Sequence, residues 1–311
     1  MNHDAEQERK EYGVETTGHE WDGIRELNNP LPRWWVWVFY ATIVWGVIYT
    51  MAYPAWPLVN KATAGFLGYS TRALVEEEIA EVNDQNAELI ARLAETDPVD
   101  LAAAAAEDED LRNYAINGGR AIFAANCSQC HGSGANGVQA AGYPSLIDDD
   151  WLWGGTVEEI AYTVAHGIRN EQSLDARYSQ MPAYGDIFSA EEIETVVQYV
   201  MSLSDSDGDG TNDRGYAYDT AAVEEGGQIF YDNCAACHMD DGTGDPFQGA
   251  PNLTDIVWLY GGDEATLIET VTHSRFGIMP AWGEEYRVGG GLSQDEINAV
   301  ALYVHQLGGG E

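Results

Sequence analysis

Lysine is nearly absent from this chain of 311 residues, in which Lys10 and Lys61 are the only two. Lysine and arginine together number 14, against 52 aspartates and glutamates, so the formal net charge is −38. A surface of this sign repels phosphate backbones, and we expect no nucleic-acid partner. The composition is also typical of proteins that work in concentrated salt, where charges are strongly screened. It predicts a halophilic or salt-adapted source, and the alternative is an exported protein that is simply acidic.

Charged residues are missing altogether between Trp34 and Asn60. A run of this length spans the hydrocarbon core of a lipid bilayer, and Arg33 and Lys61 bracket it. Aromatic side chains near both ends suit the two membrane–water interfaces. They are Trp34, Trp35, Trp37, Tyr53 and Trp56. We predict a transmembrane helix over residues 33–59, with a buried core helix as the alternative.

Cysteine is scarce as well, and all four cysteines lie in the motifs CSQCH and CAACH. The six motif residues are Cys127, Cys130, His131, Cys234, Cys237 and His238. C-x-x-C-H is the attachment motif of c-type haem, in which two thiols bind the porphyrin and the histidine binds the iron. A zinc site of four cysteines or two disulfides are the alternatives. Each copy carries its own histidine, 107 residues apart, which favours two covalently bound haem c groups.

Basic residues on the two sides of the apolar run are nearly balanced, with Arg25 and Arg33 before it and Lys61 and Arg72 after it. Charge therefore leaves the orientation open. Haem c is attached on the outer side of the bacterial inner membrane, so we expect everything after residue 60 to face the periplasm. Residues 1–32 would then be a cytoplasmic segment. Its first twenty residues are polar and are expected to be disordered without a partner.

The two cysteine motifs anchor an internal repeat. GGRAIFAANCSQCH aligns with EGGQIFYDNCAACH at an offset of 107, and QMPAYGD aligns with IMPAWGE at an offset of 98. A serine-capped amphipathic helix follows in both copies. Each unit is expected to be a class I cytochrome c domain, whose first and last helices pack together. We predict a mainly α protein with cytochrome c domain 1 at 113–204, an Asp/Gly-rich linker at 205–218 and domain 2 at 219–311.

The Met-Pro loops supply the second axial ligand in this hypothesis. Met181 follows His131 by 50 residues, and Met279 follows His238 by 41. A thioether is a soft ligand that suits haem iron opposite an imidazole and raises the reduction potential. Core packing is the usual role of a methionine. Ligation within each repeat is the simpler assumption, but two adjacent domains could exchange their loops.

Other residues compete for the same position. Met201 lies in a helical pattern and Met239 directly follows the proximal histidine, so both are weaker candidates. His166 and His273 could form bis-histidine sites, but they occur on predicted helices and are expected to be core residues or neighbours of the haem propionates. With methionine ligands, both irons are fully ligated and carry electrons without binding substrate. No catalytic residue is predicted.

Two segments outside the repeats also carry a prediction. Residues 60–112 have helical periodicity and are expected to form a periplasmic helical arm, with a solvated linker as the alternative. In the Asp/Gly-rich linker, Asp205, Asp207, Asp209 and Asp213 take positions 1, 3, 5 and 9 of a calcium loop. Position 12 is Tyr216 instead of glutamate. A structural Ca²⁺ and a solvated acidic linker are both compatible with this stretch.

The segment DGIRELNNPLPRWW, the single apolar run and the two C-x-x-C-H units together resemble the dihaem cytochrome c subunit of cbb3-type cytochrome c oxidase. The resemblance covers nearly the whole chain. It implies that electrons pass from a soluble periplasmic cytochrome c through two haems to the monohaem cytochrome c subunit. From there they reach the haem–copper catalytic subunit, which alone binds oxygen and copper. A free membrane-tethered dihaem carrier is the main alternative, and the paired Met-Pro loops argue against a dihaem peroxidase.

Overall fold

The computed structural model describes residue 10, residues 13–287 and residues 289–310. Its packing divides the chain into two compact units, residues 1–82 and 83–311. The first unit holds the apolar run, and the second holds both cysteine motifs.

A β-hairpin opens the described part of the first unit. Strands β1 (Thr16–Trp21) and β2 (Ile24–Leu27) pair antiparallel, with Trp21 opposite Ile24. Asp22 and Gly23 form the turn and have φ angles of 49° and 82°. An Asp-Gly pair is favoured there because both positions of a tight hairpin turn need positive φ. Residues 16–20, expected to be disordered, therefore form a strand, whereas residues 1–9 and 11–12 lie outside the described part.

Helix α2 (Arg33–Ala52) holds the apolar run and has 20 residues. It is long and apolar enough to cross a membrane, with a length of about 30 Å, which matches the hydrocarbon core. It ends seven residues before the predicted boundary at residue 59. The reason is Pro54, which disfavours the helical conformation for the residue before it, and Tyr53 is extended with a ψ angle of 161°.

Three helices occupy most of the segment between the apolar run and the first cysteine motif. They are α3 (Thr71–Gln85), α4 (Ala87–Glu95) and α5 (Pro98–Glu107). Helices α4 and α5 belong to the core of the second unit and pack against α13 (Gln294–His305). Asn298 on α13 is fully buried and donates to the carbonyl of Leu93 at 2.7 Å. This part of the expected arm therefore belongs to the hydrophobic core against which Cys127 packs.

The remaining helices of the second unit follow the predicted repeat. The first half contains α6 (Glu109–Ile122), η1 (Phe123–Cys127), α7 (Ser128–His131), η2 (Gln139–Ala141), α8 (Val157–His166), η3 (Tyr184–Asp186) and α9 (Ala190–Ser202). The second half contains α10 (Val223–Asn233), α11 (Ala235–His238), α12 (Glu264–His273) and α13. Ser189 and Ser293 form capping boxes at the starts of α9 and α13, as the sequence predicts.

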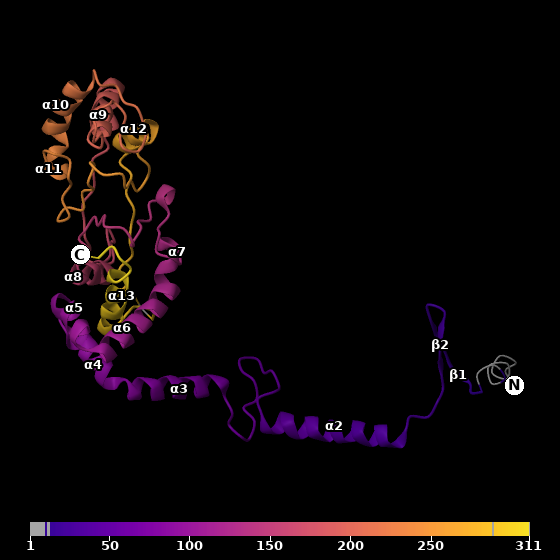
Figure 1. Cartoon of the computed structure of the whole chain (residues 1–311). Coiled ribbons are helices and arrows are strands. Elements are labelled where there is room, and N and C mark those ends of the chain that lie inside the picture. The colour runs from indigo at the N-terminus through magenta and orange to yellow at the C-terminus, as the bar shows by residue number, and fades with distance from the viewer. Residues whose placement is uncertain (1–9, 11–12, 288, 311) are drawn as a thin grey trace. The chain divides into compact units, whose positions relative to one another are not determined.

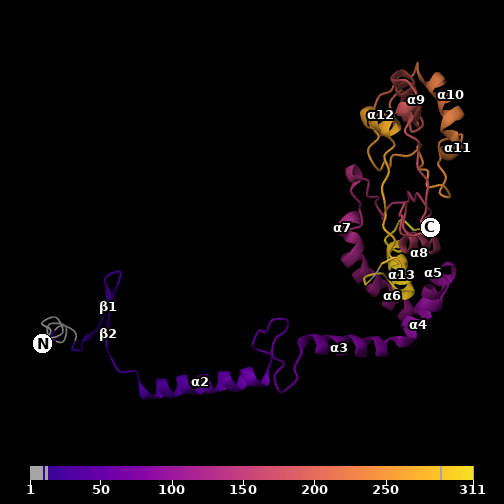
Figure 2. The same cartoon turned by 180° about the vertical axis from the view of Figure 1, so that it is seen from behind.

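The two repeats exchange their last helices. Helix α13 packs on α6 and α8, whereas α9 packs on α10 and α12 (Figures 1 and 2). The expected arrangement, in which the first and last helices of one repeat pack together, differs from this packing. Helices α9 and α10 follow each other along the chain, with residues 203–222 between them, and consecutive elements are usually neighbours in space. Helix α13 then packs with the helices of the first repeat. The predicted domain limits, 113–204 and 219–311, therefore describe the sequence repeats and not the packed cores.

The crossing of α6 with α13 and the crossing of α10 with α9 each depend on a glycine. A Cβ atom on Gly119 of α6 would lie 2.2 Å from the carbonyl oxygen of Ala299 on α13. A Cβ atom on Gly226 of α10 would lie 2.3 Å from the carbonyl oxygen of Thr195 on α9. Gly119 and Gly226 occupy equivalent repeat positions, so the same close crossing is built twice from exchanged partners.

Candidate haem sites

Each C-x-x-C-H motif places its histidine on a short helix that ends at that residue. His238 ends α11 and is 9% exposed, with Nδ1 3.1 Å from the carbonyl oxygen of Pro251. His131 ends α7, and its Nδ1 lies 3.0 Å from the carbonyl oxygen of Pro144. A histidine that donates from Nδ1 keeps the lone pair of Nε2 for a metal. The two sites therefore orient their imidazoles in the same way.

Burial adjusts the acid–base properties of these groups. It lowers the pKa of His131 and His238, although the proline carbonyl beside each ring acts in the opposite direction. The neutral imidazole, which is the form that ligates metals, is thereby favoured. Burial, with a smaller contribution from the second thiol of each motif, raises the pKa of Cys127 and Cys234 to about 11.

The two cysteine pairs lie in different parts of the core. Cys127 packs against the cluster that contains α6 and α13, and Cys234 packs against the cluster that contains α9 and α10. All four thiols are free. The pairs do not converge, so the geometry does not support the alternative of a single four-cysteine zinc site.

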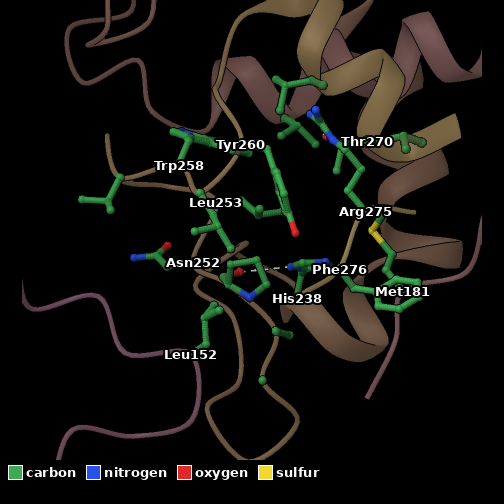
Figure 3. A pocket seen from close by; sticks show the side chains of 18 of the residues that line it. Leu152, Met181, His238, Asn252, Leu253, Trp258, Tyr260, Thr270, Arg275 and Phe276 are labelled. Carbon is green, nitrogen blue, oxygen red and sulfur yellow. Dashed lines mark hydrogen bonds between the residues drawn. The ribbon is translucent and has the colours of Figure 1, made fainter. Parts of the chain in front are cut away.

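A cavity of about 580 Å³ opens beside His238. Its wall contains Cys234 and Cys237 together with Met181, and Figure 3 shows Met181, His238 and Tyr260 around it. Most of the lining is apolar, as expected for a site that takes a large flat ligand. The apolar lining residues include Val196, Val197, Val200, Phe230, Leu253 and Leu267. Two thiols, an oriented imidazole, a thioether and an apolar wall are the donor set that a c-type haem requires.

The loop that carries Met181 is tied to the second repeat. The hydroxyl of Ser274 donates to the carbonyl oxygen of Met181, and the hydroxyl of Tyr184 donates to the carbonyl oxygen of Asn233 at 2.8 Å. Asn233 directly precedes Cys234. Met181 therefore lines the cavity of His238, in the other repeat.

The loop that carries Met279 makes the reciprocal contact with the first repeat. Met279 and Ile168 exchange two backbone hydrogen bonds of 2.9 and 3.1 Å, and Trp282 donates to the carbonyl oxygen of Val164 at 3.0 Å. Met279 packs on the same cluster as Cys127. The structure thus brings each methionine loop to the cysteine motif of the other repeat, which is the exchange that the sequence left open and not the simpler assumption.

The competing residues have other surroundings. Met201 is 1% exposed in the second core, and Met239 is 39% exposed with a φ angle of 64°. His166 is half-buried, with its Nδ1 3.0 Å from the hydroxyl of Tyr286. His273 is exposed at the end of α12 and is not a core residue. These surroundings favour Met181 and Met279 as the second axial ligands over these four residues.

Two aromatic residues at the sites were not identified from the sequence. Trp153 and Tyr260 occupy equivalent repeat positions, 107 residues apart, and Tyr260 lines the cavity of His238. The indole Nε1 of Trp153 is buried and has no acceptor within the described part of the chain. A buried N–H group without a partner is costly, and a carboxylate of a bound haem would satisfy it. The same offset of 107 pairs Trp151 with Trp258 and Gly154 with Gly261, so the alignment already contained both positions.

The Asp/Gly-rich linker brings three of its four candidate ligands together. Oxygen atoms of Asp205, Asp207 and Asp209 lie within 4.8 Å of one another, whereas Asp213 accepts from the hydroxyl of Ser206 at 2.7 Å. A hydrogen bond from Tyr218 is the main cause that lowers the pKa of Asp205 to about 2. Calcium binding in this loop stays a prediction, and the solvated linker stays its alternative.

Two cytochrome c domains, preceded by one helix that is long and apolar enough to cross a membrane, define a mainly helical protein of the cytochrome c class. The family model for the N-terminal domain of cytochrome oxidase-cbb3, FixP, matches residues 13–60. The model for subunit III of cbb3-type cytochrome c oxidase matches residues 115–200, and that for cytochrome c matches residues 223–308.

Similar proteins cover nearly the whole chain. The cbb3-type cytochrome c oxidase subunit CcoP of Cereibacter sphaeroides is 52% identical over 298 residues, with 95% of each chain covered. The FixP subunit of Azorhizobium caulinodans is 46% identical, with 96% of this chain and 94% of the relative covered. The chain belongs to the CcoP/FixP family of cbb3-type cytochrome c oxidase subunits, so it is an electron-transfer subunit of a membrane oxidase and carries c-type haem.

Proposed function

We propose that this subunit accepts electrons from a soluble periplasmic cytochrome c and passes them through two haems. They then reach the monohaem cytochrome c subunit and the haem–copper catalytic subunit of the same oxidase. The reciprocal pairing of the methionine loops with the cysteine motifs carries the proposal, because it supplies two complete ligand sets. A haem bound at each site would supply one-electron transfer.

The exchanged packing supports one set of ligands for each site. Cys127 and Cys130 would hold one haem covalently, and His131 and Met279 would be the ligands of its iron. The other motif would hold the second haem, and the residues of that site are Cys234, Cys237, His238 and Met181. An imidazole and a thioether on each iron would raise the reduction potentials and would leave neither iron a position for substrate. This favours electron transfer over peroxidase chemistry.

The environment of the chain follows from the same hypothesis. Helix α2 crosses the bacterial inner membrane once, with residues 1–32 in the cytoplasm and the haem-bearing unit in the periplasm. The excess of acidic residues gives the protein a strongly negative surface, which suits a halophilic or salt-adapted source.

The ligand pairing is tested in chains that carry a single haem. Cys127→Ala and Cys130→Ala together leave only the haem at His238. In this background, we expect Met181→Ala to abolish the long-wavelength methionine–iron absorption band and to lower the potential. Met279→Ala should leave both properties unchanged. The opposite pattern would show ligation within each repeat, and a band that neither variant removes would contradict both methionines.

Whether this chain is a subunit of the oxidase is tested by purifying the native protein in mild detergent. A preparation that contains haem b and copper in addition to haem c supports a subunit of the oxidase. A chain that purifies alone with two haem c groups would support the free dihaem carrier instead.

A further inference from the structure

The first repeat has an insertion between its middle helix and its methionine. Met181 follows His166 by 15 residues, whereas Met279 follows His273 by only six. The extra segment contains Arg169, whose backbone has a φ angle of 51°, a conformation unusual for a residue other than glycine. Arg169 has no counterpart in the second repeat.

Two other arginines show what an equivalent pair looks like. Arg177 and Arg275 lie 98 residues apart, the same offset as the two methionines. Nε of Arg177 donates to the hydroxyl of Thr163 at 2.9 Å, and Nε of Arg275 donates to the hydroxyl of Thr270 at 3.0 Å. Arg177 lies beside α8 and Arg275 lies beside α12, which are the middle helices of their own repeats. Each arginine therefore belongs to one haem site.

Arg169 instead contacts both methionine loops. Its Nε donates to the carbonyl oxygen of Gly277 at 2.7 Å, and its Nη1 donates to the carbonyl oxygen of Ser179 at 2.6 Å. Gly277 and Ser179 each precede their methionine, Met279 or Met181, by two residues. One planar guanidinium therefore holds the two loops at the same repeat position, a geometry that its rigid set of donors allows.

The charge of Arg169 has no acidic partner in the described part of the chain. The side chain is half-buried and lines the cavity beside His238, and its remaining N–H groups have no acceptor among the described residues. A half-buried cation without a counter-ion is costly, and it is notable in a chain of net charge −38. Carboxylates are the groups that a guanidinium binds best, and a haem carries two as its propionates.

We infer that Arg169 is a positioning residue shared by both haem sites. It holds the two methionine loops together through its hydrogen bonds, and its free N–H groups bind a haem propionate in the cavity. The two reduction potentials are therefore set jointly. The inference rests on the proposed exchange of the methionine ligands, because only that exchange brings the two loops to one side chain.

The test uses the full-length protein with both haems, purified in detergent, and a redox titration followed by absorbance. We expect Arg169→Gln to weaken the methionine–iron band at both haems and to lower both potentials, because a nearby cation favours the reduced iron. Arg169→Lys keeps the charge but cannot hold both carbonyls in the same fork. It should therefore weaken both bands while the potentials stay closer to those of the wild type.

Arg177→Gln and Arg275→Gln are the matched controls, since each should alter one haem only. Covalent haem content, measured after denaturation, shows whether each variant has matured. A change at a single haem in Arg169→Gln, or two unchanged potentials, would overturn the shared role. A wild-type protein without a methionine–iron band would instead contradict the ligand assignment itself, so the two failures are distinguishable.

Discussion

Replacing either of two adjacent glycines on α6 by alanine should change the stability of the protein, and the two changes should have opposite signs. At Gly119, an added Cβ atom would lie 2.2 Å from the carbonyl oxygen of Ala299 and 2.7 Å from the Cβ atom of Tyr303. At Gly118, nothing lies within 4 Å of the added atom. Both residues are inside α6, so the backbone preference for alanine over glycine is the same at both positions.

The magnitudes follow from two competing terms. Alanine is favoured over glycine inside a helix by about 1 kcal/mol, and this is the whole effect expected for Gly118→Ala. The methyl group at Gly119 meets a backbone atom that cannot rotate away, so overpacking costs about 3 kcal/mol, the upper part of the usual range. We expect Gly118→Ala to stabilise the protein by about 1 kcal/mol and Gly119→Ala to destabilise it by about 2 kcal/mol.

Urea unfolding of the haem-loaded protein in detergent, followed by circular dichroism, measures the two changes. Helix α13 follows the loop of Met279, so Gly119→Ala should also weaken the methionine–iron band of the haem at His131. Gly118→Ala should leave that band as in the wild type. Two stabilised variants would refute the close crossing of α6 and α13, and with it the contact that defines the exchange.

Three further outcomes follow from charged groups. Burial, reinforced by Asp255 and other nearby aspartates, raises the pKa of Asp150 from 3.8 to about 7. Its contribution to stability is fully present below pH 3.8 and is lost as the pH rises through about 7. In thermal melts across this range, Asp150→Asn should remove that loss, and an unchanged slope would contradict it. If the Asp/Gly-rich linker binds Ca²⁺, a chelator should lower the melting temperature of the wild type but not of Asp205→Asn. Calcium-independent melting without bound metal would support the solvated linker. Turnover of the oxidase with its donor cytochrome should persist in strong salt, because exposed charges are screened, and a steep decline would indicate steering by opposite charge.

Local patterns in the sequence determined most of the elements of this protein and its class. The cysteine motifs, the Met-Pro loops and the serine caps are short covalent or backbone signals, and they act over a few residues wherever the chain places them. The mainly α fold, the two cytochrome c domains and the family were therefore predicted correctly. Two local signals were missed, namely the Asp-Gly turn of the hairpin and Pro54, which ends α2 early.

Only the tertiary structure decided which parts belong together. The two repeats share one hydrophobic pattern, so α13 could pack on α6 or on α10 as far as local sequence is concerned. The choice depends on contacts between residues far apart in the chain, such as Asn298 with Leu93 and Met279 with Ile168. The role inferred for Arg169 depends on the same choice. Its two acceptors come from different repeats, and they meet at one guanidinium only after the last helices are exchanged.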